Sequence, residues 1–203
     1  KGMHHAVNCE NFLSFDKQRD ALVQQGLLSR NDMFSVTDVC RWEGVTCRLG
    51  PVNLVREIRW EFPLQIARIN IRWLPFTVES LYIGDQQRAK KAAIDTRYLP
   101  RDLKTVEITV CSWPGRLDMT SLPRHMEKLV SHAKHLCGTL TIVNLPKTLK
   151  TVHITFNWFS AILVDNQALP HSFEEMKLEY GGKYKMRVRE INGDKMDGRI
   201  TVQ

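Results

Sequence analysis

The sequence repeats one short pattern of apolar and polar positions. Leu-Pro occurs five times, at residues 74, 99, 122, 145 and 169, with gaps of 25, 23, 23 and 24 residues. After each Leu-Pro, one apolar residue is followed by two spacers, a second apolar residue, one spacer and a third inward position. A fixed period in the twenties indicates a solenoid of stacked repeats. The alternation inside each unit predicts a short strand with one buried face.

The same pattern fills the five Leu-Pro units and an earlier unit that lacks Leu-Pro. The expected inward-facing residues are Val55, Ile58 and Trp60; Val78, Leu81 and Ile83; Leu103, Val106 and Ile108; Met126, Leu129 and Ser131; Leu149, Val152 and Ile154; and Phe173, Met176 and Leu178. Ser131 is the polar exception. Each strand is too short to be stable alone, so we expect six of them to stack and bury one continuous core.

A second pattern follows the strands. The stretches "CSWPGRLDM" and "KHLCGTLTI" align, and "NWFSAILVD" fits less well, in an apolar column, a small-residue column and a leucine column. These columns hold Trp113, Leu136 and Phe159; Gly115, Gly138 and Ala161; and Leu117, Leu140 and Leu163. The C-terminal "DGRITV", with Gly198, Ile200 and Val202, continues this second theme.

The L-x-x-L-x-L spacing resembles that of leucine-rich repeat proteins. That family places Asn or Cys three residues after the strand, where this chain has Cys111 and Asn157 in two repeats and Gln86 and Lys134 in two others. The second pattern looks like the plant-type subclass, in which a short strand replaces a helix on the convex side. The resemblance implies a leucine-rich repeat solenoid, α/β by family but strand-rich here, with a parallel β-sheet on its concave face.

The N-terminal region resembles the cap of plant-type repeats. Apolar residues between 12 and 28 have nearly helical spacing, and "VCRWEGVTC" at 39–47 fits the cap motif Cys-x-Trp-x-Gly-Val-x-Cys. Proteins with Leu-Pro at each repeat start are also similar to leucine-rich repeat proteins of kinetoplastid-like protists. We expect a helical, cysteine-containing cap at 1–51, six repeats at 52–190 starting near 52, 74, 99, 122, 145 and 169, and a closing strand at 191–203.

The pair Cys40 and Cys47 raises three interpretations. Structural zinc usually needs four ligands, and no second closely spaced pair is present. Redox motifs use Cys-x-x-Cys, which six intervening residues do not match. A local disulfide or two packed thiols remain, in a stretch that covers the first repeat as a lid with Trp42 packed beneath it. The total of five cysteines argues against a fully paired secreted framework.

No catalytic motif is present, so we predict neither an enzyme nor a cofactor, a metal or a small-molecule substrate. A phosphate-binding loop, a nucleophile elbow and a kinase-type set are all missing. The repeat model separates the clustered His125, His132, His135 and Cys137 along one repeat. No apolar run is long enough to span a membrane, and no signal peptide is visible, so we expect an intracellular protein in the cytoplasm or an organelle.

Strand alternation predicts which side chains face a partner on the concave sheet. The candidates are Arg59, Tyr82, Thr105, Glu107, Lys128, His132, Thr151, His153 and Lys177. Over all outward positions, three basic residues (Arg59, Lys128, Lys177) oppose five acidic ones (Glu57, Glu61, Glu107, Glu175, Glu179), which makes this face about −2. Mixed charge with threonine and histidine suits a protein surface better than a phosphate backbone.

The whole chain carries a net charge of +7, so the positive charge must lie elsewhere. We place it on a basic rim of turns and flanks: Arg88, Lys90, Lys91, Arg97, Arg101, Lys183, Lys185, Arg187 and Arg189. The sequence favours a non-enzymatic protein-interaction scaffold or structural subunit of a larger assembly. The alternative is a structural component of a ribonucleoprotein that contacts RNA through the basic rim. A third and weaker hypothesis is an extracellular recognition domain.

Overall fold

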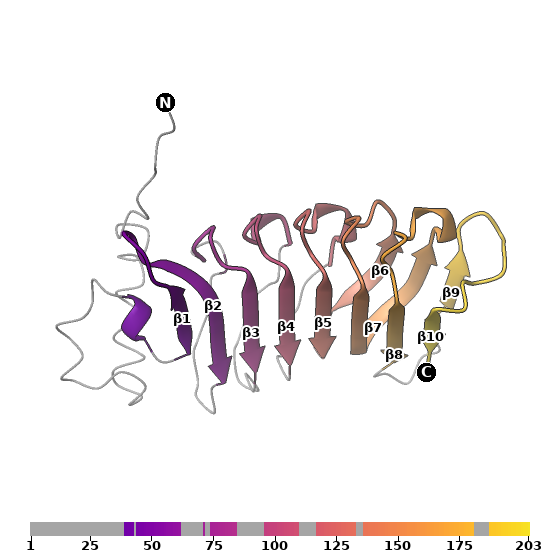
Figure 1. Ribbon diagram of the computed structural model, residues 1–203. Coiled ribbons are helices and arrows are strands. Elements are labelled where there is room, and N and C mark those ends of the chain that lie inside the picture. The colour runs from indigo at the N-terminus through magenta and orange to yellow at the C-terminus, as the bar shows by residue number, and fades with distance from the viewer. Residues whose placement is uncertain are drawn as a thin grey trace.

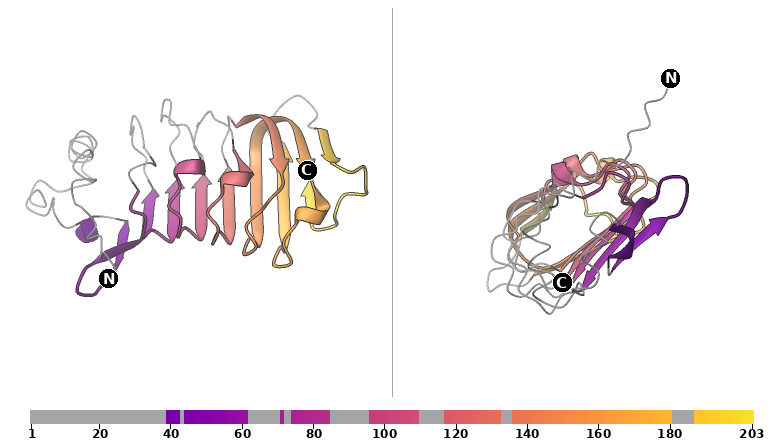
Figure 2. Two further views of the ribbon diagram at one scale, coloured as in Figure 1. Left: turned by 90° about the horizontal axis from the view of Figure 1, so that it is seen from above. Right: turned by 90° about the vertical axis from the view of Figure 1, so that its left-hand side faces the viewer.

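The computed structural model describes residues 39–42, 44–61, 71, 74–84, 96–109, 117–132, 136–180 and 187–203. The strands stand side by side in one elongated stack (Figure 1). Viewed along the stack, the chain circles a single interior, with the long sheet on one side (Figure 2, right). Within the described ranges, no helix has the length and apolar character needed to cross a membrane.

One long sheet runs the length of the molecule. Its strands, in spatial order, are β1 (Val45–Arg48), β2 (Leu54–Glu61), β3 (Ser80–Gly84), β4 (Thr105–Thr109), β5 (Lys128–His132), β7 (Thr151–Val164), β8 (Glu175–Tyr180) and β10 (Ile200–Val202). All neighbours from β2 to β10 pair in parallel, and β1 pairs antiparallel with β2. The expected leucine-rich repeat solenoid with a parallel sheet is therefore confirmed.

A second, shorter sheet lies on the opposite side of the interior. It consists of β6 (Cys137–Ile142), the second half of β7, and β9 (Arg187–Glu190), all parallel. β7 belongs to both sheets and bends between them at Phe156, whose φ is 57°. The helical elements described here are 3-10 turns: η2 (Val39–Arg41), η4 (Thr96–Tyr98), η5 (Met119–Ser121) and η6 (Asn166–Ala168).

Each Leu-Pro opens a tight turn that starts a strand of the long sheet. In all five copies, the carbonyl oxygen of the proline accepts a hydrogen bond from the backbone N–H three residues later, at 3.0–3.2 Å. Three of these turns also have a hydroxyl that binds the backbone of the previous rung: Thr77 to Val55 (2.7 Å), Thr148 to Met126 (2.8 Å) and Ser172 to Leu149 (2.9 Å). These bonds fix the register between rungs as well as the turn itself.

The interior is one apolar cluster that extends from Trp42 to Ile200. Every inward-facing residue predicted for the six strands is at most 8% exposed, which confirms the pattern. Ser131 is 2% exposed, and its hydroxyl has no hydrogen-bond partner. Burying an unsatisfied hydroxyl costs about 1–3 kcal/mol, so this position weakens the β5 rung.

Asn157 satisfies the backbone where β7 bends. Its side-chain amide donates to the carbonyl oxygens of Thr155 (2.9 Å) and Ser131 (3.4 Å), and its side-chain oxygen accepts from the N–H of Leu136 (3.2 Å). Buried backbone groups must be paired, so the Asn expected after the strand serves both its own turn and the preceding one. Cys111, Gln86 and Lys134 lie outside the described residues.

The N-terminal end is closed by the stretch 39–48. A disulfide joins Cys40 in η2 to Cys47 in β1, and Trp42 is buried against the first rung as expected. Gly44 has φ 73°, and a β-carbon at this position would lie 2.0 Å from the carbonyl oxygen of Arg59. The glycine is therefore required for the cap to approach β2. The cap helix expected before residue 39 lies outside the described residues.

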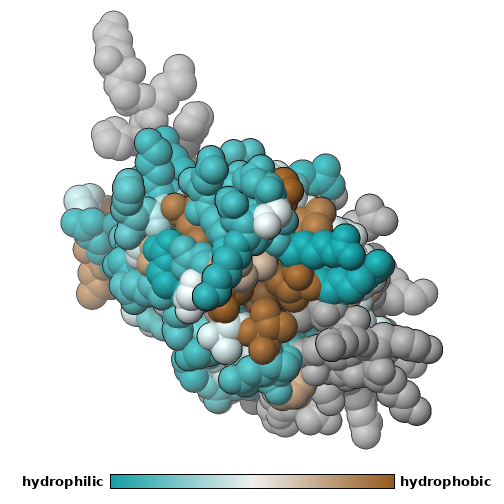
Figure 3. Space-filling model, turned by 90° about the vertical axis from the view of Figure 1, so that its right-hand side faces the viewer, coloured by the Kyte–Doolittle hydropathy of each residue, from teal (hydrophilic) through white to brown (hydrophobic). Residues whose placement is uncertain are grey.

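The C-terminal end corrects one expectation. "DGRITV" was expected to continue the second pattern, but Ile200 pairs with Met176 in the long sheet, as a seventh parallel rung. The strand that continues the second sheet is instead β9, at 187–190. The period-2 alternation is the same in both sheets, so it does not tell which sheet a strand joins. Apolar residues gather in the middle of this end face (Figure 3).

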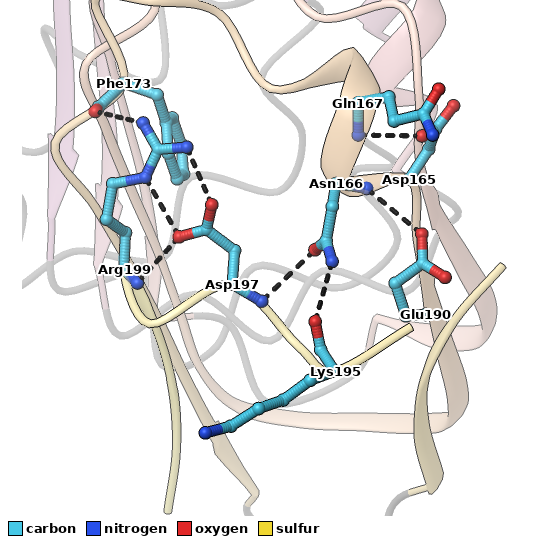
Figure 4. A network of polar contacts seen from close by, with 8 residues as sticks. All are labelled: Asp165, Asn166, Gln167, Phe173, Glu190, Lys195, Asp197 and Arg199. Carbon is cyan, nitrogen blue, oxygen red and sulfur yellow. Dashed lines mark hydrogen bonds and ion pairs between the residues drawn. The ribbon is translucent and has the colours of Figure 1, made fainter. Parts of the chain in front are cut away.

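A polar network ties the last turns together (Figure 4). Asp197 holds Arg199 through two side-chain contacts, at 2.9 and 2.8 Å, and Arg199 donates to the carbonyl oxygen of Phe173 at 3.0 Å. The side chain of Asn166 bridges Lys195 and Asp197. Glu190, 8% exposed, accepts backbone N–H bonds from Asn166 and Asp194. The last rung is therefore held by polar contacts as well as by apolar packing.

Replacing Leu149 by Ala should lower the free energy of unfolding by about 2–5 kcal/mol, because the leucine is fully buried between rungs and its loss leaves a cavity. Denaturant unfolding measures this value. The matched control is Lys147→Ala, an exposed substitution in the same turn, which should change stability by less than about 0.5 kcal/mol. Equal effects of the two substitutions would contradict the stacked-rung core.

Asp197→Asn should destabilise the protein at neutral pH and have less effect in acid. Hydrogen bonds from Arg199 lower the pKa of Asp197 to about 2, from an ordinary 3.8. Because the folded-state pKa is depressed, the stabilisation is present above about pH 4 and is lost as the pH falls through 2. The group is partly exposed, so we expect a difference on the order of 1 kcal/mol. Urea unfolding at neutral and acidic pH measures the difference in unfolding free energy between this variant and the wild type. Asp194→Asn is the control.

Candidate functional site

The outward-facing side chains of the long sheet, here called the outer face, form three rows because the strands pair in register. The first row holds Glu57, Ser80, Thr105, Lys128, Thr151 and Glu175. The middle row holds Arg59, Tyr82, Glu107, Val130, His153 and Lys177. His132 lies in the third row, opposite Thr109. The structure therefore brings all nine predicted concave-face residues onto one surface.

Arg59 and Tyr82 form a fixed pair at the N-terminal half of the outer face. The guanidinium of Arg59 lies 4.0 Å from the centre of the Tyr82 ring and pairs with the carboxylate of Glu61. A β-carbon on Gly84 would lie 2.8 Å from the Tyr82 hydroxyl, so the glycine gives the ring room to lie against the sheet. The Tyr82 hydroxyl is 3.4 Å from that of Thr109. These contacts hold an exposed arginine and an aromatic ring in one orientation.

In the middle of the outer face, the charged side chains pair with one another and the apolar one is covered. Lys128 donates to Glu107 at 3.3 Å. Val130 lies between Glu107 and His153 in register and is only 3% exposed, although it points outward by strand alternation. The neighbouring side chains therefore cover it, and the surface above β4 and β5 is polar.

Two histidines lie on the C-terminal half of the outer face. His153 contacts Glu175 at 2.7 Å, and Lys177 pairs with the same carboxylate at 2.8 Å. Hydrogen bonds from Lys177 and His153 lower the pKa of Glu175. His132 contacts the hydroxyl of Thr155. Burial lowers the pKa of His132, and repulsion by His153 and Lys128 lowers it further. Attraction to Glu107 and Glu179 acts in the opposite direction.

A row of alternating charge, here called the charge ladder, borders the outer face. Its members in consecutive rungs are Arg56, Glu79, Lys104, Glu127, Lys150 and Glu174. Glu79 pairs with Arg56 and, at 2.8 Å, with Lys104, while Glu127 pairs with Lys150 at 2.8 Å. The hydrogen bond from Lys150 lowers the pKa of Glu127. The ladder has no net charge and links neighbouring rungs.

The predicted basic rim is only partly within the described residues. Arg97 lies in η4 and Arg101 in the turn before β4, whereas Arg187 and Arg189 are exposed on β9 of the second sheet. These two pairs belong to different surfaces. Arg88, Lys90, Lys91, Lys183 and Lys185 lie outside the described residues.

The described part of the chain contains no group of three or more His, Cys, Asp or Glu side chains that could hold a metal ion. Cys137 is an exposed free cysteine at the start of β6, whereas His132 is the last residue of β5. The three cations of the outer face, Arg59, Lys128 and Lys177, each pair with a carboxylate. The arrangement is suited to contact with another surface.

One comparison with known proteins supports the fold. No protein-family model and no curated protein matches the sequence. A solved structure does match: the leucine-rich repeat ectodomain of the receptor kinase SOBIR1 from Arabidopsis thaliana, with a TM-score of 0.54 and 18% sequence identity. The alignment covers 86% of this chain and 96% of that chain. This chain folds as a leucine-rich-repeat-like solenoid. The finer resemblances, to plant-type repeats, a cysteine cap and protist proteins, stay predictions.

Two features of this surface were missed from the sequence. The charge ladder follows the first inward residue of each unit, and its alternating sign is readable once the repeats are aligned. The stacking of Arg59 on Tyr82 is not readable, because 22 residues separate them along the chain and the contact depends on the pairing of β2 with β3.

The unfolding free energy should fall as the pH drops below about 6.5, in part because of His132. Its folded-state pKa is lowered. At pH values between this lowered pKa and about 6.5, the folded protein therefore binds fewer protons than the unfolded chain. The stabilisation is therefore present above about pH 6.5 and lost below it. His132→Gln should flatten this part of a denaturation profile measured against pH. The control is His171→Gln, at an exposed turn; an identical flattening there would exclude the role of His132.

Proposed function

We propose that this protein is a non-enzymatic protein-interaction module that binds a partner protein on the outer face of its long sheet. The observation that carries the proposal is the internal pairing of charge on that face. Arg59 pairs with Glu61, Lys128 with Glu107, and Lys177 and His153 with Glu175. A face whose cations are neutralised in this way attracts a phosphate backbone weakly, and it suits a polar protein surface.

The Arg59–Tyr82 pair is the proposed anchor for that partner. Arginine and tyrosine are enriched among the few residues that dominate binding energy at protein interfaces. Both side chains are already held in place, by Gly84 beneath the ring and Glu61 beside the guanidinium. A partner therefore meets them with little further loss of side-chain freedom. The likeness of the fold to a receptor ectodomain supports an interaction role without naming a partner.

Affinity capture from the native source tests this proposal. A specific protein partner should be captured by the wild-type chain, remain after nuclease treatment, and bind the Arg59→Ala and Tyr82→Ala variants at least about 30-fold more weakly, which corresponds to about 2 kcal/mol. Isothermal titration with the purified partner measures the difference.

The matched controls are Trp158→Ala and Arg187→Ala, which remove the same kinds of side chain from the second sheet. They should leave the affinity unchanged. Loss of the partner on nuclease treatment would favour a ribonucleoprotein role, and a partner lost only in the control variants would place the interface on the second sheet.

A further inference from the structure

A second surface runs along the edge where the strands of the long sheet begin. The first residue after each proline lies at the same place in its turn. In Figure 1, β3, β4 and β5 all run downward, so the ends at which they begin point upward. These residues, here called the turn ridge, are Phe76, Arg101, Arg124, Lys147 and His171. All five are exposed, and successive rungs are about 4.8 Å apart. The five side chains therefore lie in one row, one strand spacing apart.

The turn ridge carries positive charge that the rest of the surface does not neutralise. Within the described residues, Arg101, Arg124 and Lys147 form no ion pair, and the side chain of Arg124 donates one hydrogen bond, to the ring of His125 at 3.0 Å. Two of the three carboxylates of the neighbouring charge ladder, those of Glu79 and Glu127, are already paired with ladder cations. Asp102 is the single carboxylate in the five turns. The five turns therefore contain three cations, in consecutive rungs, and one acid.

An exposed aromatic residue stands at the end of the same row. Phe76 is 55% exposed although its side chain is apolar. Tyr98, 39% exposed, precedes the Arg101 turn and lies 5.9 Å from the guanidinium of Arg97. Single-stranded nucleic acid is bound by this combination, in which cations follow the phosphates and bases stack on aromatic rings.

We propose that the turn ridge binds single-stranded nucleic acid, with phosphates on Arg101, Arg124 and Lys147 and a base on Phe76. An acidic polypeptide would use the three cations but has no need of an exposed phenyl ring at the end of the row. Arginine also presents a planar fork that matches a phosphate. This surface is separate from the outer face, so the proposal does not depend on the protein-interaction function.

Fluorescence anisotropy with labelled oligouridylate tests it on the full chain. Three phosphate contacts predict that the affinity falls about 20-fold between about 50 and about 200 mM salt. The triple variant Arg101→Gln, Arg124→Gln, Lys147→Gln should reduce the slope of log affinity against log salt by about 2. Phe76→Ala should weaken binding between about 5-fold and about 100-fold, and Phe76→Tyr should restore it.

The control triple variant is Arg187→Gln, Arg189→Gln, Lys195→Gln, which removes the same charge from exposed sites near the C-terminal end. It should keep the wild-type slope. Equal loss in the control, no binding of oligouridylate at about 50 mM salt, or equally tight binding of oligoglutamate would overturn the proposal. Oligothymidylate separates the two nucleic acids: equal binding assigns recognition to phosphates and bases, and weaker binding assigns a share to the 2′-hydroxyl.

Discussion

The whole structure depends on one constraint: no rung of this chain can bury its apolar side chains alone. Each strand of the long sheet offers a few inward residues, such as Leu81 and Ile83, that reach zero exposure only when the rungs on both sides are present. Backbone pairing, the proline turns and the hydroxyl contacts of Thr77 and Thr148 all serve this stacking. Stability is therefore shared between neighbours, and the ends become the vulnerable points.

The two ends meet this problem by different means. At the N-terminal end, the Cys40–Cys47 disulfide and buried Trp42 hold the antiparallel strand β1 over the first parallel rung. At the C-terminal end, Asp197 and Arg199 hold the last rung through charged hydrogen bonds. Polar contacts can do this because they also satisfy the backbone groups that the final turn exposes.

Stacking also sorts the charges into surfaces with different chemistry. Equivalent positions in successive repeats become neighbours, so a charge pattern with alternating sign becomes a self-neutralising ladder, as at Glu79 and Lys104. A position that is Arg or Lys in three successive repeats becomes a ridge of unpaired charge, as at Arg101 and Arg124. A net charge of +7 is thus compatible with a nearly neutral outer face and a basic edge on one small domain.

The amino-acid pattern by itself determined the solenoid, the rung spacing and the side of each strand that is buried, because a period of about 24 residues and an alternation of two are local properties of the chain. It also indicated the nine outward candidates, through that same alternation. Only the tertiary structure decided that 200–202 joins the long sheet and 187–190 the second one, and that Arg59 stacks on Tyr82 over Gly84. These outcomes depend on which strands pair and in what register, and a local pattern does not specify the partner of a strand.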